Sequence, residues 1–496
     1  MPTLPNHRSA ILYQNASSTV ILIDIPTSIG LAQRLNESGN QGDDALKDTS
    51  GLVLLSCDPL QHPYPSPPEP KTESARNRVL SQIPASQQQF HTEIVPIINN
   101  ALQELREHHH GDWCFPRHTR LPTRIGKQKD RELHEEIKST AESDQGPDQG
   151  GRPQKRKRNE LDAKGPMISS WEPTLTVQVG PQPQGSCSPA LNEPPLILSP
   201  GINQIPCLNA IQGIIVQNPA RVQTILNIKS EEPPCPTTGI GPWSPDYIPI
   251  NIPPESTFLN CHLTPPTESH PSPVPSLSSD TKFNFILMDP PWPNRSVRRS
   301  SHYKEYAGPL QPIVEGVLQN HLHPHQAIVA IWITNSMKSR SATLSALETV
   351  GLHSFEEWIW VKTTVDGQPA SPPDGLWRRP YEVLILAHKD KHVTQDSKGE
   401  AANGPCEIKR RVIVAVPDIH SRKPNVKELV ENIFFSPPTE AVSGAQRGGE
   451  NPPRAYSALE VFARNLTAGW WACGDEVIRF NWKGWWDEKG RTERET

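Results

Sequence analysis

The sequence lacks several features that would assign it to a structural class at once. Its 8 cysteines are scattered and contain no Cys-x-x-Cys pair, which argues against a disulfide framework or a zinc module and fits a reducing compartment. There is no cationic segment followed by an apolar leader, and no apolar run reaches the roughly eighteen residues of a membrane span. We therefore expect a chain that is neither secreted nor membrane-spanning and that holds no metal.

Apolar residues are also scarce. They make up 34% of the 496 residues, whereas the 55 prolines are about twice the average usage. Part of the chain is therefore expected to form disordered linkers outside any packed core. The net charge of −5 and the pI near 6.4 give no global basic signature. Any contact with nucleic acid must come from local patches.

The N-terminal half divides into a small accessory region and a linker. Residues 1–120 carry two β-rich runs between 9 and 26, and helical spacing from Val79 to Arg106 predicts a helix that ends at the histidine run 108–110. Consecutive histidines point in different directions from a helix end, so a solvated run is favoured over a metal cluster. Residues 121–247 are predicted to be a mostly disordered, basic and Pro-rich linker.

A compact basic cluster lies within this linker. Residues 152–158 read Arg-Pro-Gln-Lys-Arg-Lys-Arg, which is typical of a nuclear import signal or of an electrostatic arm for phosphates. A solvated charge run is about as common. The compactness of the cluster favours import, so we predict a nuclear protein, with the cytosol as a second location.

Residues 248–488 have a different character, and residues 489–496 form a short tail. Ten of the 13 tryptophans lie in this part, and apolar runs of strand length alternate with helical patterns. The alternation predicts an α/β fold with a Rossmann-like doubly wound sheet. The predicted strands are 252–263, 285–288, 327–333, 355–362, 382–388, 412–416 and 458–465, and the predicted helices are 339–350 and 423–433.

One predicted strand, Phe285 to Met288, runs directly into Asp289-Pro290-Pro291-Trp292. Open α/β sheets carry their chemistry at the carboxyl ends of such strands. Because proline fixes φ and removes a donor, Asp289 and the Pro290 carbonyl are expected to form a rigid pair of acceptors beside the face of Trp292. That set suits a planar amine such as the exocyclic amino group of adenine. The structural alternative is a helix-capping Asp and a packed Trp.

With its neighbours, this loop resembles the signature of the eukaryotic adenine-N6 methyltransferases, the MT-A70-like family, and most of all its methyltransferase-like-four branch. The resemblance covers roughly residues 250–486. It implies the class I S-adenosylmethionine-dependent methyltransferase fold with a permuted motif order. The ordered motifs that carry it are 289–292, 294–300, 357–362, 380–386 and 459–465.

The resemblance implies roles for individual residues. The catalytic loop is matched by Asp289, Pro290, Pro291 and Trp292, and the methyl donor is S-adenosylmethionine. Lys423 matches a lysine that contacts the donor, with the donor's carboxylate as the expected partner. The residues implied to bind the donor are Cys261, His262, Leu263, Asp289, Lys423, Glu460, Arg464, Asn465, Asp475 and Glu476.

Two positions depart from the family pattern. His262 stands where many relatives carry Asp, and Asp475 with Glu476 stands where they have Asn followed by Gln or Glu. An Asp can accept a hydrogen bond from a ribose hydroxyl but cannot donate one as Asn does. The departures put the affinity for the donor in question, and the acidic residues can instead be ordinary loop carboxylates.

A short basic stretch with an aromatic residue follows the catalytic loop. Lysine and arginine contacts to phosphates position a nucleic acid and make its binding salt-dependent, and aromatic or guanidinium groups stack on bases. The alternatives are a solvated loop and packing of Trp377 into the domain. The residues predicted to contact nucleic acid are Asn294, Arg295, Arg298, Arg299, Tyr303, Trp377, Arg378 and Arg379.

The sequence thus predicts a methyltransferase that acts on adenine N6 in RNA, such as small nuclear RNA, with DNA as the second substrate and no metal. We expect it to act without an obligate methyltransferase partner. A non-catalytic nucleic-acid-binding subunit is the alternative from another class, although the intact Asp289 argues against it. An enzyme that methylates small-molecule or protein amines would not need the basic stretch.

Overall fold

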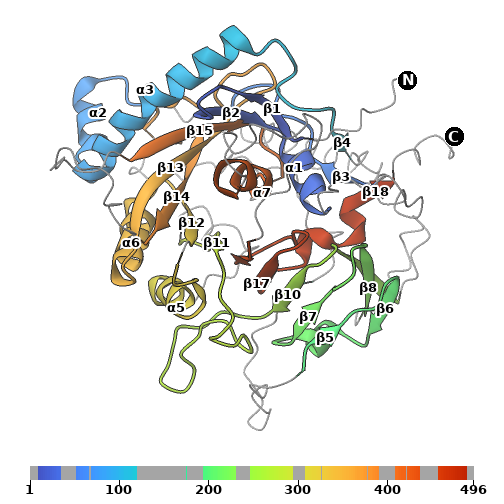
Figure 1. Cartoon of the computed structure of the whole chain (residues 1–496). Coiled ribbons are helices and arrows are strands. Elements are labelled where there is room, and N and C mark those ends of the chain that lie inside the picture. Colours follow the sequence, from blue (N-terminus) through green and yellow to red (C-terminus); the bar gives the residue numbers. More distant parts are fainter. Residues whose placement is uncertain are drawn as a thin grey trace, which may run out of the picture.

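The computed structural model describes residues 9–34, 52–65, 69–119, 175, 194–230, 246–293, 308–325, 327–376, 378–389, 408–419, 422–435 and 456–488. Within these ranges, twelve strands form one mixed sheet that runs through the molecule (Figure 1). This confirms the predicted α/β fold. In order across the sheet, the strands are β1 (Ile11–Gln14), β2 (Val20–Ile23), β15 (Lys409–Ala415), β13 (His353–Lys362), β14 (Tyr381–His388), β12 (Ile328–Ile333), β11 (Phe285–Met288), β16 (Ala458–Val461), β17 (Trp471–Gly474), β10 (Thr257–Asn260), β7 (Ile215–Gln217) and β5 (Leu196–Ile197).

The centre of the sheet is parallel. Strand β11 pairs with β12 on one side and β16 on the other, and β17 and β10 continue in the same direction. Parallel strands covered on both faces are read in sequence as continuous apolar runs, and all four residues of β11 are buried. The parallel pairing places the carboxyl ends of β11, β16, β17 and β10 at one edge of the sheet.

Helices cover both faces of the sheet (Figure 1). On one face lie α3 (Ala85–His108), α5 (Gln311–His321) and α6 (Met337–Thr349), and on the other α1 (Ile25–Ala32) and α7 (Lys427–Val430), which continues as a π turn over Glu431–Phe435. In the segments that the structure describes, no helix is both long and apolar enough to cross a membrane. The remaining short elements are α2 (Glu73–Leu80) and 3₁₀ turns at Leu208–Ile211, Arg479–Asn481 and Lys483–Trp485.

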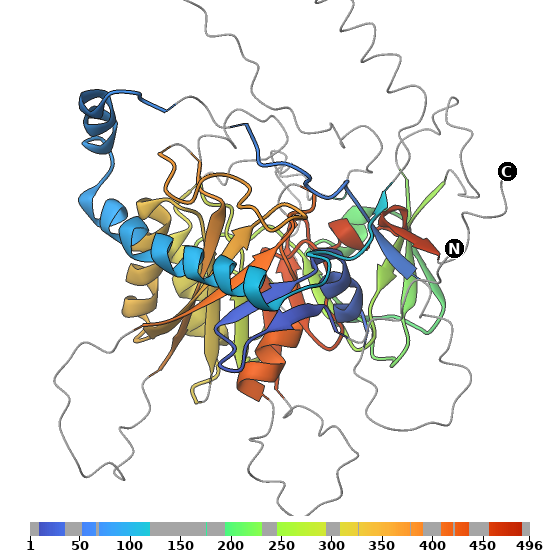
Figure 2. The ribbon, with the colours of Figure 1, turned by 90° about the horizontal axis from the view of Figure 1, so that it is seen from above.

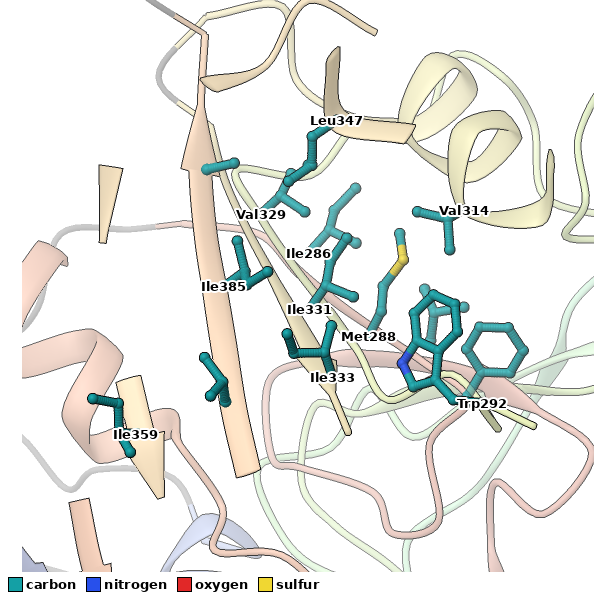
Figure 3. Packing of buried hydrophobic residues seen from close by; sticks show 14 of the residues in the cluster. Ile286, Met288, Trp292, Val314, Val329, Ile331, Ile333, Leu347, Ile359 and Ile385 are labelled. Carbon is teal, nitrogen blue, oxygen red and sulfur yellow. The ribbon is translucent and has the colours of Figure 1, made fainter. Parts of the chain in front are cut away.

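The core beside the catalytic strand is densely packed, as Figure 3 shows. Side chains of β11 (Ile286, Met288) interdigitate with those of β12 and with Val314 of α5 and Leu347 of α6. Each fully buried side chain of this kind stabilises the fold by about 1.5–3 kcal/mol relative to an exposed one. The loop that follows β11 therefore starts from a rigid base.

The N-terminal hairpin is an edge of the central sheet and not part of a separate accessory unit. Strand β2 pairs in parallel with β15, and α3 lies across both (Figure 2). Every residue of β2 is buried, and an isolated two-stranded hairpin has no means of covering such a strand on both faces. The predicted helix is confirmed at its end but not at its start. Helix α3 runs from Ala85 to His108 with Pro96 inside it, whereas Val79 belongs to α2, which ends at Leu80 before the boundary at Pro84.

The described part of the expected linker, residues 194–230, also folds. There β7 pairs with β10 of the central sheet. A second sheet forms from β6 (Ile202–Ile205), β8 (Thr224–Lys229) and β9 (Tyr247–Ile252). The sequence prediction of a domain that begins at residue 248 missed these strands because each is short and needs its partners for burial. The basic cluster 152–158 and the tail 489–496 lie outside the described residues.

The N-terminal region also fixes the segment that follows β15. Arg117 donates from Nη1 to the Pro417 carbonyl at 2.7 Å and from Nη2 to the Val416 carbonyl at 2.8 Å. Its Nη1 lies 3.7 Å from Asp418 Oδ1, and the two side chains are 1% and 0% exposed. The Asn425 N–H donates to Ser28 Oγ at 3.0 Å. The third sheet is also small. It consists of β18 (Trp486–Glu488), β3 (Leu52–Ser56) and β4 (His118–Thr119) and joins the N-terminal region to the C-terminal end.

These contacts predict that Arg117→Ala destabilises the protein by about 3–5 kcal/mol, because it leaves Asp418 and two carbonyls buried with fewer partners. Urea denaturation measures the change. The control is Arg221→Ala, which removes an exposed pair at 3.8 Å from Glu255 and is expected to change the stability by less than about 1 kcal/mol. Equal effects of the two substitutions would show that the Arg117 contacts do not hold the segment.

Candidate active site

Three strands deliver polar side chains to one cleft. Asp289 follows β11, Lys423 lies on the segment after β15, and Glu460 belongs to β16, which continues into Arg464 and Asn465. The empty space of the cleft, its open mouth included, is about 500 Å³. No group of three or more His, Cys, Asp or Glu side chains suited to a metal ion occurs among the described residues. Five predicted site residues therefore line a single cleft.

A chain of alternating charges includes two residues that line the cleft, Asp289 and Lys423. Lys423 Nζ lies 2.7 and 2.8 Å from the two carboxylate oxygens of Asp289 and 3.4 Å from Glu382 Oε2. Glu382 also accepts a hydrogen bond from Lys362 Nζ at 2.6 Å. The charge chain Lys362–Glu382–Lys423–Asp289 thus holds the Asp289 carboxylate in one orientation.

The charge chain keeps Glu382 and Lys423 ionised. Burial by itself would raise the pKa of Glu382, but Lys362 and Lys423 lower it to about 2. Burial by itself would lower the pKa of Lys423, but Asp289 and Glu382 raise it. Sequence reasoning missed Lys362 and Glu382 as site residues. Both residues lie in motifs that carry the family resemblance, and these motifs were the signal in the sequence by which they could have been found.

Glu460 differs from the other carboxylates. Burial, and secondarily the charge of Asp289, raise its pKa to about 8. The carboxyl group is therefore mostly protonated at neutral pH and can both donate and accept hydrogen bonds. A neutral carboxyl group can hydrogen-bond to the hydroxyls of a ribose. It also places no second negative charge beside Asp289.

The structure contradicts the predicted stacking role of Trp292. Its ring lies in the core beside Met288 and Val314 (Figure 3), is 7% exposed, and donates Nε1–H to the Trp332 carbonyl at 2.7 Å. In this conformation Trp292 anchors the loop instead of presenting a face to a base. The Pro290 carbonyl accepts the Trp292 N–H at 2.7 Å, which leaves one of its lone pairs for another donor.

The loop after β16 approaches β17 closely. Phe462 has a φ of 59°, so the chain turns sharply before it reaches Arg464. A Cβ at Gly474 would lie only 3.2 Å from Phe462 Cα, and the φ of 150° at this position also favours glycine. This close approach brings Arg464 Nε to 3.0 Å from Glu476 Oε2.

Five further residues predicted to bind the donor lie just beyond the ends of β10 and β17. Strands β10 and β17 run in parallel with Asn260 opposite Gly474, so Cys261, His262 and Leu263 lie next to Asp475 and Glu476. His262 Nδ1 is 3.5 Å from Asp475 Oδ2. The two departures from the family pattern are therefore partners of each other. Burial raises the pKa of the Cys261 thiol to about 12, so backbone groups are what this residue can offer a ligand.

Of the predicted nucleic-acid contacts, two lie within the described residues. Arg378 is exposed, and its guanidinium lies 5.4 Å from the centre of the Tyr64 ring. Arg379 donates from Nη1 to the Pro373 carbonyl at 2.8 Å and is partly buried. The sequence analysis did not single out Tyr64 as a candidate contact to nucleic acid. The other six predicted contacts, Asn294, Arg295, Arg298, Arg299, Tyr303 and Trp377, lie outside the described residues.

The raised pKa of Glu460 predicts a stability that depends on pH. Relative to the unfolded chain, where the pKa is near its ordinary value of 4.5, the contribution of Glu460 is fully present below that value and is lost as the pH rises towards 8. Glu460→Gln removes the titration, so its Tm should rise relative to the wild type between about pH 5 and pH 8. Thermal denaturation without ligand measures this difference, with the exposed Glu348→Gln as baseline. A difference independent of pH would mean that Glu460 does not titrate as described.

The part of the chain that forms the cleft is similar to known proteins. The MT-A70 family model covers residues 283–476. The N6-methyladenosine RNA methyltransferase MTA1 of Cryphonectria parasitica is 34% identical over 213 residues, 42% of this chain and 55% of that protein. The N(6)-adenine-specific methyltransferase METTL4 of Homo sapiens is 30% identical over 231 residues, 46% of this chain and 43% of that protein.

A DNA N6-methyl methyltransferase of Caenorhabditis elegans is 28% identical over 224 residues, 44% of this chain and 56% of that protein. The chain spans about half the length of the curated relatives it matches. The family match includes Asp289, Lys423 and the β16 loop, which together form the cleft. Residues 283–476 of this chain, which include the cleft, are thus similar to the MT-A70 family.

Proposed function

We propose that this chain is an S-adenosylmethionine-dependent methyltransferase that transfers a methyl group to N6 of adenine in nucleic acid, with RNA favoured over DNA. The observation that carries the proposal is the cleft in which Asp289, Lys423, Glu460, Arg464 and Asn465 meet. Relatives named for methylation of adenine in RNA and in DNA support the choice of adenine. The RNA-named relative has the higher identity of the two.

The side chains that line the cleft fit S-adenosylmethionine. When bound, S-adenosylmethionine would supply an electrophilic methyl group on its sulfonium. The cleft has an acidic side at Asp289 for the positive sulfonium and cationic groups for a carboxylate. The neutral Glu460 carboxyl and the Asn465 amide would hold hydroxyl groups. Backbone groups of Cys261 to Leu263 are the proposed contacts to the donor's adenine.

In this proposal Asp289 and Pro290 act on the target amine. The Asp289 carboxylate accepts one N–H of the amine, and the remaining lone pair of the Pro290 carbonyl accepts the other. Lys423 keeps the Asp289 carboxylate in place through both oxygens. When the amine becomes methylated it loses a proton, and the Asp289 carboxylate is the base positioned to hold it.

The exposed pair Tyr64 and Arg378 offers a surface for the nucleic acid. Strand β14 runs antiparallel to β13, with Tyr381 opposite Val361, so its start lies at the same edge of the sheet as the carboxyl ends of β12 and β13. Arg378 precedes that start by a few residues. A ring and a guanidinium at this edge can stack on bases beside the target adenine.

We also propose that the chain works in the nucleus and without an obligate methyltransferase partner. The basic run 152–158 supports the location. The pairing of β2 with β15 supports activity without a partner. Strand β2 covers, within the same chain, the edge of the sheet at β15, which a partner could otherwise occupy. Activity found only in a heteromer, by size exclusion with light scattering, would overturn it.

The test is transfer of labelled methyl to matched single-stranded RNA and DNA oligonucleotides that contain one adenine each. Asp289→Asn is expected to lower the rate at least about 100-fold, because it weakens the acceptor and the base together. Asp280→Asn, at an exposed loop carboxylate, is the matched control and should keep the wild-type rate. No transfer by the wild type, with oligonucleotide binding retained, would favour the non-catalytic subunit.

A further inference from the structure

Gln33, at the C-terminal end of α1, belongs to a closed ring of hydrogen bonds with Asn481 and the backbone of Leu466. Gln33 Nε2 donates to the Leu466 carbonyl. The Leu466 N–H donates to Asn481 Oδ1 at 2.7 Å, and Asn481 Nδ2 donates to Gln33 Oε1 at 3.0 Å. All three residues are buried. Each member of the ring therefore donates one hydrogen and accepts one.

The ring fixes the direction of both side-chain amides. An amide nitrogen donates and an amide oxygen accepts, whereas the Leu466 N–H needs an acceptor and the Leu466 carbonyl needs a donor. Either amide turned around would therefore set two donors or two acceptors against each other. Asn481 Nδ2 also donates to the Asn251 carbonyl of β9 at 2.9 Å. The backbone of Leu466 is thus held in one orientation and is attached to the second sheet.

This orientation reaches the cleft through the chain itself. Arg464 and Asn465, which line the cleft, come directly before Leu466. They lie between β16 and β17 and belong to neither strand, so no ladder of hydrogen bonds fixes them. The Leu466 N–H belongs to the planar peptide bond that joins Asn465 to Leu466. Its hydrogen bond to Asn481 therefore fixes the backbone of Asn465 and with it the direction of the Asn465 side chain.

Helix α1 holds a second lining segment of the same cleft. Ser28 Oγ accepts the N–H of Asn425, which also lines the cleft, at 3.0 Å. The Ala32 carbonyl accepts the Ala468 N–H at 2.8 Å. One N-terminal helix thus bonds to the segment after β15 and to the loop after β16. The spacing between these two lining segments depends on α1.

We propose that Gln33 is a positioning residue for the methyl donor. Through the ring with Asn481 it holds the backbone of Leu466 and so orients the Asn465 side chain toward the donor. This inference rests on the proposed function, since it requires the donor to bind in this cleft. Gln33 lies outside the family match of residues 283–476, so a residue of the N-terminal region contributes to the affinity for the donor.

Isothermal titration of Gln33→Met tests the proposal with two probes, S-adenosylhomocysteine and a single-stranded RNA oligonucleotide that contains one adenine. Methionine keeps the length of the side chain and removes the amide, so the ring opens without a large cavity. Binding of S-adenosylhomocysteine should weaken about 3- to 10-fold, the range for one net hydrogen bond. Binding of the oligonucleotide should change less than about 2-fold.

The matched control is Asn218→Leu, which removes another buried amide. Asn218 Nδ2 donates to the Val222 carbonyl at 3.0 Å and to the Pro253 carbonyl at 2.9 Å. Asn218 lies outside the set of residues that line the cleft. Asn218→Leu should lower the Tm at least as much as Gln33→Met does, because it leaves buried carbonyls without a donor. It should keep the wild-type affinity for S-adenosylhomocysteine.

Initial rates separate positioning from a loss of folded protein. A smaller folded fraction lowers the apparent kcat and leaves KM unchanged, whereas a misplaced donor loop raises KM for the donor. Gln33→Met should raise KM for S-adenosylmethionine about 3- to 10-fold and leave KM for the oligonucleotide near that of the wild type. Gln33→Asn is the second variant. It keeps an amide that is one methylene too short to close the ring, and it should show the same selective loss.

Circular dichroism checks that the variants fold. Wild-type affinity for S-adenosylhomocysteine in both Gln33 variants, or equal weakening in Asn218→Leu, would overturn the inference alone. Equal weakening of both probes in Gln33→Met would overturn it as well. If the wild type does not bind S-adenosylhomocysteine, the proposed function fails first.

Discussion

The charge chain Lys362–Glu382–Lys423–Asp289 is the interaction on which the rest of the site depends. A partly buried charge without a partner is strongly destabilising, so each member needs its neighbours. The four residues come from the end of β13, the start of β14, the segment after β15 and the end of β11. The same interactions that satisfy these charges therefore tie separate strands together and fix the orientation of the Asp289 carboxylate.

The cleft also depends on residues outside the matched family domain, which covers residues 283–476. The segment after β15, which carries Arg422 and Lys423, is held from the N-terminal region by Arg117, Ser28 and the Leu55 carbonyl. The loop after β16 is held likewise, since Gln33 bonds to the Leu466 carbonyl and to Asn481. The supports of the cleft thus include residues of the N-terminal region, outside the matched family domain.

Sequence reasoning succeeded where a local pattern carried the information. The apolar run before Asp289 and the two prolines after it predicted a buried strand, and helical spacing predicted most of α3. Sequence reasoning failed where pairing depends on distant partners: β2, although predicted as a β-rich run, joins the central sheet only through β15, and β8 forms only beside β9. The packing of Trp292, the charges at Lys362 and Glu382, and the pairing of His262 with Asp475 likewise arise from residues brought together by folding.

We propose that one cleft at the carboxyl ends of β11 and β16 holds the methyl donor beside Asp289. A crystal structure of the chain with S-adenosylhomocysteine tests this most directly. We expect the ligand in the cleft, with its sulfur facing Asp289 and its ribose near Glu460. Ligand density on another part of the surface, or a cleft that closes over the Lys423–Asp289 pair and leaves no room for the ligand, would contradict the claim.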